Sequence, residues 1–537
     1  MLKKIAFKTF IFAGIITVMG ISSIASSYGD NKNSPIVDIP DQGPIKGAEN
    51  EGIVAFKGIP YALPPINENR WLPPQPYPGW SGIKEAVQFA SNCQQKPNSW
   101  DTSLSKEHLS EDCLYLNIWA PKDFINHQTN NGYPVMVWIH GGGLVNGGTS
   151  LPLYDGSNLA RQNVVVVTIN YRLGRFGFFA FPALHKESEE QEWANYGLMD
   201  QIAALQWIKK SISSFGGNSN NITLFGESAG GDSILALMTT PEANKLFNKA
   251  IIQSGTSNFS LLSPRPWQQA VAIAQKFAEK HGIHGIEKND LANLRKLPAE
   301  AILDGLNLEN MQRDLFSGIV IDGVLLRQSI KDAFKDGNFQ PIPILIGAND
   351  GDGVFFNKTD LNILTKQLGT TTQEIKHVYD PENKLTDNKI LHQVSADWQF
   401  IQPTHALARQ LSKFNVPVYE YRFSYVAKPA RPYTSYGAPH ASELPFVFDN
   451  LKAAFKNIEP QDTAMAKAVS TYWVNFARSE VPTAGEFPAA PKFDANNPKL
   501  LHFTLQGPFV ESDPFQKRLD FIEQLQNKKT PPMPKKN

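Results

Sequence analysis

The chain has 537 residues, of which 42% are hydrophobic, and this is enough to build a well-buried core. Its 51 Lys and Arg residues balance its 51 Asp and Glu residues, so the formal net charge is zero. This balance excludes the basic excess that is typical of nucleic-acid-binding proteins. The length is compatible with several domains, but also with one large α/β unit that carries insertions.

The first 25 residues have the pattern of a secretory signal peptide. Lys3, Lys4 and Lys8 form a positively charged start, an apolar segment follows from about residue 10 to 21, and a Ser-Ile-Ala motif ends at Ala25. The apolar segment is shorter than the roughly 20 residues that a membrane-spanning helix needs, and no other segment of the sequence fits a span. We therefore expect cleavage near Ala25 and a secreted or periplasmic protein.

Both ends of the remaining chain are polar. Residues 26–50 contain scattered Pro and Gly, so we expect an N-terminal lead-in there. Residues 526–537 are rich in Lys and Pro, and we expect a disordered tail. One folded domain over 51–525 lies between them.

The chain has two cysteines, Cys93 and Cys113. An exported protein meets an oxidising compartment, so a disulfide between them is expected. The bridge would close a loop of about 20 residues and contribute roughly 3 kcal/mol in the chain-entropy model. No His or second Cys pair stands at a spacing typical of metal ligands, so we expect no metal site.

Six short apolar runs predict strands that are buried on both faces. They lie at 134–139, 164–169, 222–225, 250–252, 342–346 and 418–423. Between them, residues 195–210 have apolar side chains on one helical stripe: Leu198, Ile202, Leu205 and Ile208. Alternating strands and helices predict an α/β fold with a mostly parallel sheet between helices.

Gly226-Glu227-Ser228-Ala229-Gly230 is a G-x-S-x-G motif. It directly follows the predicted strand at 222–225, and a helical pattern follows it. This is the context of a nucleophile elbow, in which glycines allow a sharp turn that exposes the serine. We therefore predict that Ser228 is a nucleophile.

His140-Gly141-Gly142-Gly143 follows the predicted strand at 134–139. Glycines let backbone N–H groups approach a bound carbonyl closely, as in an oxyanion hole. We assign donors to Gly142 and Gly143, with Ala229 as the third. The Ala229 N–H also lies at a helix start, where the dipole favours negative charge.

A serine hydroxyl needs a base, and the base in turn needs an acid. In nucleophile-elbow enzymes these follow the serine in the order acid, then histidine. His440 fits this order, and His502 competes with it. For the acid, the predicted strand at 342–346 leads into a Gly-rich loop that contains Asp350 and Asp352, and spacing does not decide between them.

From Val54 to Phe503 the chain resembles the type-B carboxylesterases, the family that includes the cholinesterases. The resemblance rests on segments 56–62, 111–121, 215–218, 225–231 and 253–255, and on His440 followed by 443–448. It implies an α/β-hydrolase fold and a Ser–acid–His triad that cleaves carboxylic esters without a cofactor. It favours His440 over His502 and supports a Cys93–Cys113 bridge.

In this family the triad acid is usually Glu, followed by Gly. Asp352-Gly353 stands in that place, so the resemblance favours Asp352 over Asp350. Asp is shorter by one methylene, about 1.5 Å, so the loop must move in or the contact with His440 must lengthen. Ser254 and Glu227 match family positions beside the triad, where we expect supporting roles.

Two alternatives concern function. The same triad can act on amides, carbamates or thioesters, whereas adhesion proteins of this family have lost it. Intact Ser228, His440 and oxyanion glycines argue against the adhesion alternative. Trp100 lies at a distance from Cys113 that differs from the choline-binding Trp of cholinesterases, so we interpret it as structural and do not predict choline esters.

Overall fold

The structure is a computed structural model, and it describes residues 35–97, 109–127, 132–187, 193–256, 263–309, 315–353 and 360–529. The predicted signal peptide, its cleavage site near Ala25, Trp100 and the tail residues 530–537 lie outside this description.

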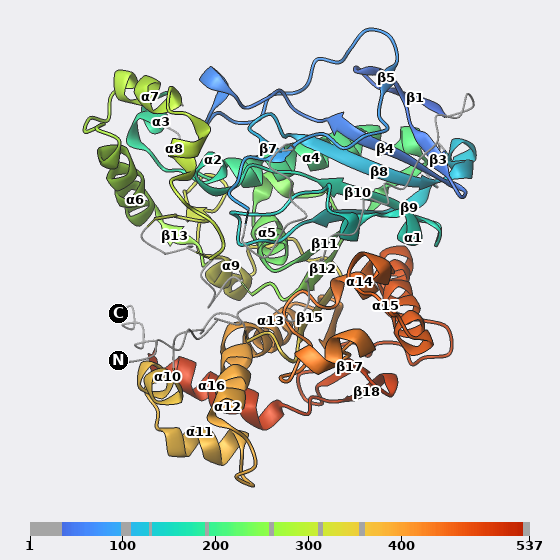
Figure 1. Cartoon of the computed structure of the whole chain (residues 1–537), viewed down its shortest axis with the longest axis vertical. Helices are drawn as coiled ribbons and strands as arrows, with labels where there is room; N and C mark the ends of the chain where they lie inside the picture. Colours follow the sequence, from blue (N-terminus) through green and yellow to red (C-terminus); the bar gives the residue numbers. More distant parts are fainter. Residues whose placement is uncertain are drawn as a thin grey trace, which may run out of the picture.

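An eleven-stranded, mostly parallel sheet runs through the molecule (Figure 1). In spatial order its strands are β18 (Gly507–Ser512), β17 (Lys499–Thr504), β16 (Val418–Phe423), β15 (Ile344–Asn349), β12 (Lys249–Gln253), β11 (Gly217–Glu227), β9 (Tyr133–Ile139), β10 (Val165–Ile169), β8 (Tyr115–Pro121), β4 (Ile53–Pro60) and β3 (Ala48–Asn50). Pairing is parallel from β17 to β10 and antiparallel at both ends. The predicted α/β fold is confirmed.

The parallel strands are apolar throughout because both of their faces are covered. Alternate residues of β9 point to opposite faces, and they belong to two different hydrophobic clusters. Val135 and Val137 pack in a cluster that also contains Leu205, whereas Trp138 packs in a cluster with Trp473.

The helices that cover the sheet divide between these two clusters. The first cluster draws on α4 (Tyr196–Ser211), α5 (Ala229–Met238) and α13 (Gln402–Ser412). The second draws on α15 (Pro460–Ser479). Burial of apolar side chains on both faces fixes the parallel strands, and thereby the loops at their carboxyl ends, in place.

A smaller helical group lies at the bottom of Figure 1. It consists of α10 (Leu361–Leu368), α11 (Thr372–Tyr379), α12 (Asp387–Ala396) and α16 (Gln516–Lys529), and it has its own hydrophobic cluster. Between α12 and α13 the chain forms one π-helical turn, η7 (Asp397–Ile401). This turn brings the helical group against the end of β15.

The remaining elements flank this sheet and the helical group. The other helices are α1 (Ser157–Ala160), α2 (Gly174–Gly177), α3 (Pro182–Glu187), α6 (Trp267–Lys280), α7 (Lys288–Arg295), α8 (Ala299–Leu303), α9 (Ile330–Asp336) and α14 (Leu444–Val447). Small sheets pair β1 (Ile36–Ile39) and β2 (Gly43–Lys46) with β5 (Lys84–Glu85), β13 (Arg265–Pro266) with β14 (Val320–Ile321), and β6 (Asn92–Cys93) with β7 (Leu109–Ser110). Strands β1, β2 and β3 fall within 26–50, the expected lead-in, and α16 extends into 526–537, the expected tail.

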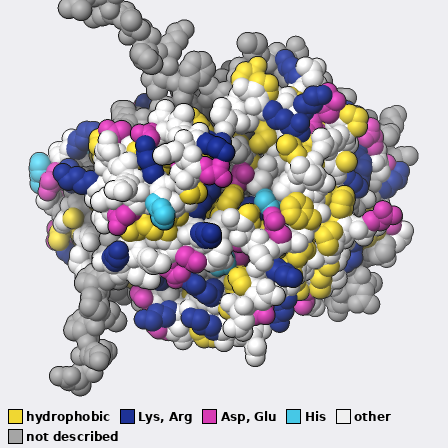
Figure 2. Space-filling view, turned by 90° about the horizontal axis from the view of Figure 1, so that it is seen from below, with side chains coloured by type: hydrophobic (Ala, Val, Ile, Leu, Met, Phe, Trp, Pro, Cys, Tyr) yellow, Lys and Arg dark blue, Asp and Glu magenta, His cyan; other side chains and the backbone are white. Residues whose placement is uncertain are grey.

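Over the described ranges, no helix has the length and apolarity that crossing a membrane requires. On the face shown in Figure 2, acidic and basic side chains are intermixed. This agrees with the balanced charge of the sequence.

Candidate active site

The predicted site residues follow neighbouring strands at one edge of the sheet. The loops after β9, β11, β12, β15 and β16 carry the glycines, Ser228, Ser254, Asp352 and His440 respectively. Carboxyl ends of parallel strands meet at one edge of a sheet, and ligands bind there in open α/β folds. Residues that are far apart in the sequence therefore lie together.

Ser228 forms a sharp turn between β11 and α5. Its φ of 54° and ψ of −121° are strained for a residue with a side chain, and its N–H donates to the Gln253 carbonyl at 2.8 Å. A Cβ on Gly226 or Gly230 would approach backbone atoms to 2.7 or 2.0 Å, so only glycine fits there. The turn leaves Ser228 partly exposed between buried neighbours.

His440 contacts Asp352 as predicted for a base and its acid. The imidazole Nδ1 lies 2.9 Å from Asp352 Oδ1, and the Asp352 side chain is 0% exposed. The other carboxylate oxygen accepts the Ser254 hydroxyl at 2.8 Å and the Asn349 N–H at 2.9 Å. The distance to His440 is ordinary for a hydrogen bond, so the shorter side chain reaches the imidazole without a lengthened contact.

The two competing candidates bind other partners. Asp350 Oδ1 accepts the Ala438 N–H at 2.6 Å. The His502 ring lies 2.7 Å from the Ser424 hydroxyl through Nε2 and 2.5 Å from Glu511 through Nδ1. The arrangement therefore favours Asp352 and His440 as the acid and the base.

Glu227, the residue before Ser228, lies at the other nitrogen of His440. Its Oε1 is 3.1 Å from Nε2, a distance typical of an ion pair, but the alignment is not that of a hydrogen bond. Burial raises the pKa of Glu227. Burial also lowers the pKa of His440, but the charges of Glu227 and Asp352 outweigh it and raise that pKa above its ordinary value. The imidazole therefore lies at the elbow that carries Ser228, in a negative environment.

The glycine loop after β9 lies against this elbow. Gly142 and Gly143 have φ values of 98° and 63°, which glycine adopts without strain. A Cβ on Gly142 would come within 2.2 Å of the Asn146 carbonyl, and one on Gly141 within 3.2 Å of Ser228 Cβ. The glycine loop therefore packs closely against the turn that carries Ser228.

Ala229, the third predicted donor, is the first residue of α5 and is fully buried. It follows Ser228 directly, so its N–H lies at the turn. The ten-residue helix behind it adds the positive end of its dipole at this point.

His140 has a structural position in this loop. Its ring stacks on Tyr171 with 4.5 Å between centroids, and Nδ1 lies 2.9 Å from the Gly141 carbonyl. Burial lowers the pKa of His140 to about 4, so the ring is neutral at pH 7. It therefore packs beneath the glycines and does not add charge to the site.

Phe400 is a site residue for which the sequence carried no signal. It lies on the π-helical turn η7, and its ring centroid is 4.8 Å from that of His440. π-Helical turns are rare and are frequent at functional sites, but no residue pattern predicts them. The Phe400 ring covers one side of the imidazole and limits its contact with water.

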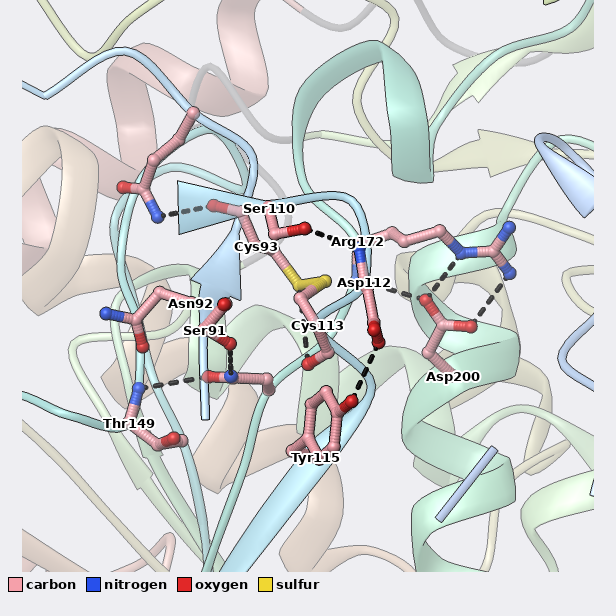
Figure 3. Close-up of a disulfide and its surroundings, with 12 residues drawn as sticks. Ser91, Asn92, Cys93, Ser110, Asp112, Cys113, Tyr115, Thr149, Arg172 and Asp200 are labelled. Carbon is pink, nitrogen blue, oxygen red and sulfur yellow. Dashed lines mark hydrogen bonds and ion pairs between the residues drawn. A yellow bond between two sulfur atoms is a disulfide. The ribbon is translucent and has the colours of Figure 1, made fainter. Parts of the chain in front are cut away.

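The predicted disulfide between Cys93 and Cys113 is present, with 1.99 Å between the sulfurs. Cys93 is the last residue of β6, and Cys113 lies two residues before the start of β8. The buried ion pair of Arg172 and Asp200 lies beside the disulfide (Figure 3). Both cysteines are almost fully buried, at 3% and 1% exposure.

The bridged segment also holds the glycine loop. Gln95, two residues after Cys93, donates to the Gly147 carbonyl at 2.5 Å and accepts from the Gly147 N–H at 2.9 Å. Asn146 donates to the same Gln95 oxygen at 3.2 Å, and its N–H donates to the Gly142 carbonyl at 2.9 Å. The disulfide therefore supports the oxyanion loop indirectly.

Away from Ser228 and His440, three residues of the kinds that bind metals lie together, although sequence spacing did not predict a metal site. Buried His405, Glu420 and Asp513 bring potential ligand atoms within 4.8 Å of one another. However, Arg422 lies 2.8 Å from Asp513, and His405 lies 3.1 Å from Glu420. Because these positive groups balance the carboxylates, we interpret the group as a structural ion-pair network.

The fold and the serine elbow define a serine hydrolase of the α/β-hydrolase class. A model of the carboxylesterase family matches residues 33–522. The chain belongs to this family and is a carboxylic ester hydrolase.

Similar proteins agree with this assignment. The chain is 34% identical over 493 residues to fumonisin B1 esterase of Sphingopyxis macrogoltabida, covering 88% of this chain and 86% of the relative. It is 36% identical over 459 residues to para-nitrobenzyl esterase of Bacillus subtilis, covering 82% and 89%. A crystal structure of a Geobacillus stearothermophilus carboxylesterase superposes with a TM-score of 0.78 at 34% identity, covering 91% of this chain and 99% of the other.

Proposed function

We propose that this carboxylesterase cleaves esters through an acyl-enzyme on Ser228, with His440 as general base and Asp352 as its acid. The observation that carries the proposal is the meeting of three strand ends. Glu227, which precedes Ser228 in the strained turn after β11, lies 3.1 Å from Nε2 of His440, and Nδ1 of the same imidazole is 2.9 Å from a fully buried carboxylate.

In the first half-reaction, His440 accepts the Ser228 proton while Oγ forms a bond to the ester carbonyl carbon. Negative charge then develops on the carbonyl oxygen. The N–H groups of Gly142, Gly143 and Ala229 stabilise it, and each such donor typically lowers the barrier by about 3–4 kcal/mol. The C–O bond to the alcohol breaks, and His440 gives its proton to the leaving oxygen.

In the second half-reaction, water replaces the alcohol. His440 removes a proton from the water, the hydroxide adds to the acyl carbon, and the bond to Ser228 breaks with return of the proton. Asp352 holds the imidazole in the tautomer that carries its proton on Nδ1 and stabilises the positive charge that forms. Glu227, whose pKa burial raises to about 8, lies on the Nε2 side of the ring.

The test is covalent labelling together with kinetics. An organophosphate that carries a p-nitrophenyl leaving group should add one phosphoryl group to the peptide that contains Ser228, read by mass spectrometry. Ser228→Ala should abolish this label and reduce kcat on the order of 10⁶-fold, whereas Ser479→Ala, an exposed serine at the end of α15, should change neither. Labelling of another residue, or ester turnover by Ser228→Ala, would contradict the proposal.

The alternative substrates share this chemistry. Comparing kcat/KM for an ester, a thioester and an anilide with the same acyl group separates them, and we expect the ester to be preferred. A higher value for the anilide would reassign the enzyme to amides.

We also propose that the enzyme is exported and that its signal peptide is removed near Ala25. The N-terminal sequence pattern and the disulfide, which is stable in oxidising compartments, support this. N-terminal sequencing of enzyme from the extracellular and periplasmic fractions should find a mature chain that begins near Ser26. An intact Met1 in the cytosolic fraction would contradict export.

A further inference from the structure

We propose that Asp350, the acid that is not in contact with His440, is a positioning residue that fixes the loop carrying His440. This inference rests on the proposed function, because it matters for catalysis only if His440 is the base. It assigns a role to a residue that the mechanism above leaves unused.

One side-chain contact and a short parallel β-bridge join the Asp350 loop to the His440 loop. The Asp350 carboxylate accepts the Ala438 N–H at 2.6 Å, and the N–H of the next residue, Gly351, donates to the Ala438 carbonyl at 2.9 Å. Gly351 also forms a β-bridge with Pro439, the residue before His440. Ala438 is therefore held on both of its backbone groups, two residues before the imidazole.

The shape of the His440 loop depends on the same carboxylate. Gly437 has a φ of 104°, and a Cβ placed on it would lie 2.4 Å from Asp350 Oδ1. Only glycine at position 437 leaves room for the Asp350 carboxylate to accept the N–H of Ala438. The side chain of Asp350 and the turn at Gly437 are therefore complementary in shape as well as in hydrogen bonding.

The Asp350 carboxylate is buried near two positively charged side chains. Burial raises the pKa of Asp350 to about 6, although the Ala438 N–H and the charges of Arg422 and Arg518 favour the ionised form. Arg422 is fixed by Asp513 at 2.8 Å, and Arg518 by Asp397 at 2.7 Å through two nitrogens. The carboxylate that holds the His440 loop therefore lies in the field of two arginines that are themselves paired with Asp513 and Asp397.

Loss of this contact would free the loop without touching the triad. A displacement of His440 by about 1 Å lengthens its contact with Asp352, and such a misplacement can cost on the order of 10²-fold in rate. The expected signature is a lower kcat with little change in KM, because no contact with substrate is removed.

The experiment compares Asp350→Ala with Asp350→Asn, and normalises kcat to active sites counted by the p-nitrophenol burst. Asp350→Ala should lower kcat per active site about 10- to 100-fold, with KM within about twofold. Asp350→Asn keeps an oxygen that can accept the Ala438 N–H and should stay within about threefold of the parent enzyme. Asp494→Ala removes a carboxylate from an exposed turn, where it accepts the Asn496 N–H at 2.9 Å, and is the matched control.

A second variant tests the same contact from the other side. Gly437→Ala should reduce kcat per active site as Asp350→Ala does, and the double variant should be less impaired than the product of the two effects. The downfield proton resonance of the His440–Asp352 hydrogen bond should shift or broaden in both single variants.

The outcomes separate this inference from the proposed function. If Asp350→Ala keeps the parent kcat per active site while His440→Ala is inactive, the positioning role is wrong and the triad stands. If Asp350→Ala lowers only the number of active sites or the melting temperature, the role is structural and the inference is overturned. If His440→Ala remains active, the proposed function itself fails.

Discussion

Nδ1 of His440 lies 2.9 Å from Oδ1 of Asp352, although Asp352 stands where type-B carboxylesterases usually have Glu. The longer family side chain is therefore not needed for this contact. Asp352 is reached through a loop that leaves β15 at Asn349, and the Asn349 N–H donates to the same carboxylate at 2.9 Å. The path of this loop therefore places the shorter Asp352 side chain within hydrogen-bond distance of His440.

The Asp352→Asn variant should lose about 10⁴-fold in kcat. The amide cannot stabilise the imidazolium, and it favours the wrong tautomer of His440. Steady-state hydrolysis of p-nitrophenyl acetate measures the effect, with Asp350→Asn as the matched control, which should cost little. A larger loss in Asp350→Asn would exchange the roles of the two acids.

The Asp352→Glu variant should also lose activity, although it restores the usual family residue. The side chain is 0% exposed and both oxygens are already bonded, so one more methylene overpacks the site. Overpacking costs about 1–3 kcal/mol, and we expect a lower melting temperature together with a kcat reduced about 10-fold or more. An active, equally stable Glu variant would show that the loop adapts freely.

Ser254→Ala should reduce kcat about 10-fold. The Ser254 hydroxyl donates to Asp352 at 2.8 Å, and hydrogen bonds to charged groups contribute about 1.5–3 kcal/mol. Ser254 adopts a φ of 48°, so its backbone strain serves to aim this hydroxyl. Ser442→Ala, which removes a buried hydroxyl that makes no hydrogen bond to the described residues, is the control. Equal kcat values for the two variants would refute the supporting role.

The pH dependence of kcat/KM should report the charge of Glu227. His440 acts as a base only when neutral, and its pKa is raised above the ordinary 6.5 because the neighbouring carboxylates outweigh burial. Activity should therefore rise with pH through a midpoint above 6.5. Glu227 is the largest of the three charges that raise this pKa, ahead of Asp352 and Glu443, so Glu227→Gln should move the midpoint to lower pH. Glu486→Gln on the surface should leave it in place. A midpoint that stays fixed or rises in Glu227→Gln would disprove the coupling.

Reduction of the Cys93–Cys113 bridge should lower the free energy of unfolding by roughly 3 kcal/mol. Urea unfolding with and without dithiothreitol measures the difference, and a Cys93→Ser/Cys113→Ser double variant should not respond to the reductant. Identical curves for oxidised and reduced enzyme would mean that the bridge does not constrain the unfolded chain.

Much of the fold could be predicted because the parallel strands are buried on both faces. The run at 418–423 coincides with β16, and the run at 134–139 lies within β9. The strands β3, β4, β8, β17 and β18 toward the sheet ends were not predicted, because polar residues such as Lys57, Asn117 and His502 interrupt their apolar runs. The lead-in at 26–50 likewise gave no strand signal, because its strands are short.

The site was predictable to different degrees. Ser228 could be predicted as the nucleophile because its flanking glycines are typical of a tight turn. The disulfide could be predicted because the chain has two cysteines. Spacing alone could not separate Asp350 from Asp352, and only the family resemblance favoured Asp352. Two acids in one Gly-rich loop differ only in backbone path, which depends on tertiary contacts such as that with Ala438. The catalytic roles themselves stay predictions until the variants are measured.

Asp352 and His440 are 88 positions apart in the sequence, and each reaches the other from the tip of a different strand. No contiguous fragment as short as a single strand–helix unit can contain this pair together with Ser228. Ester turnover therefore reports complete assembly of the sheet. It should appear only after β11, β15 and β16 have docked into the sheet, with β12 between β11 and β15, and it should vanish as soon as any one of them separates.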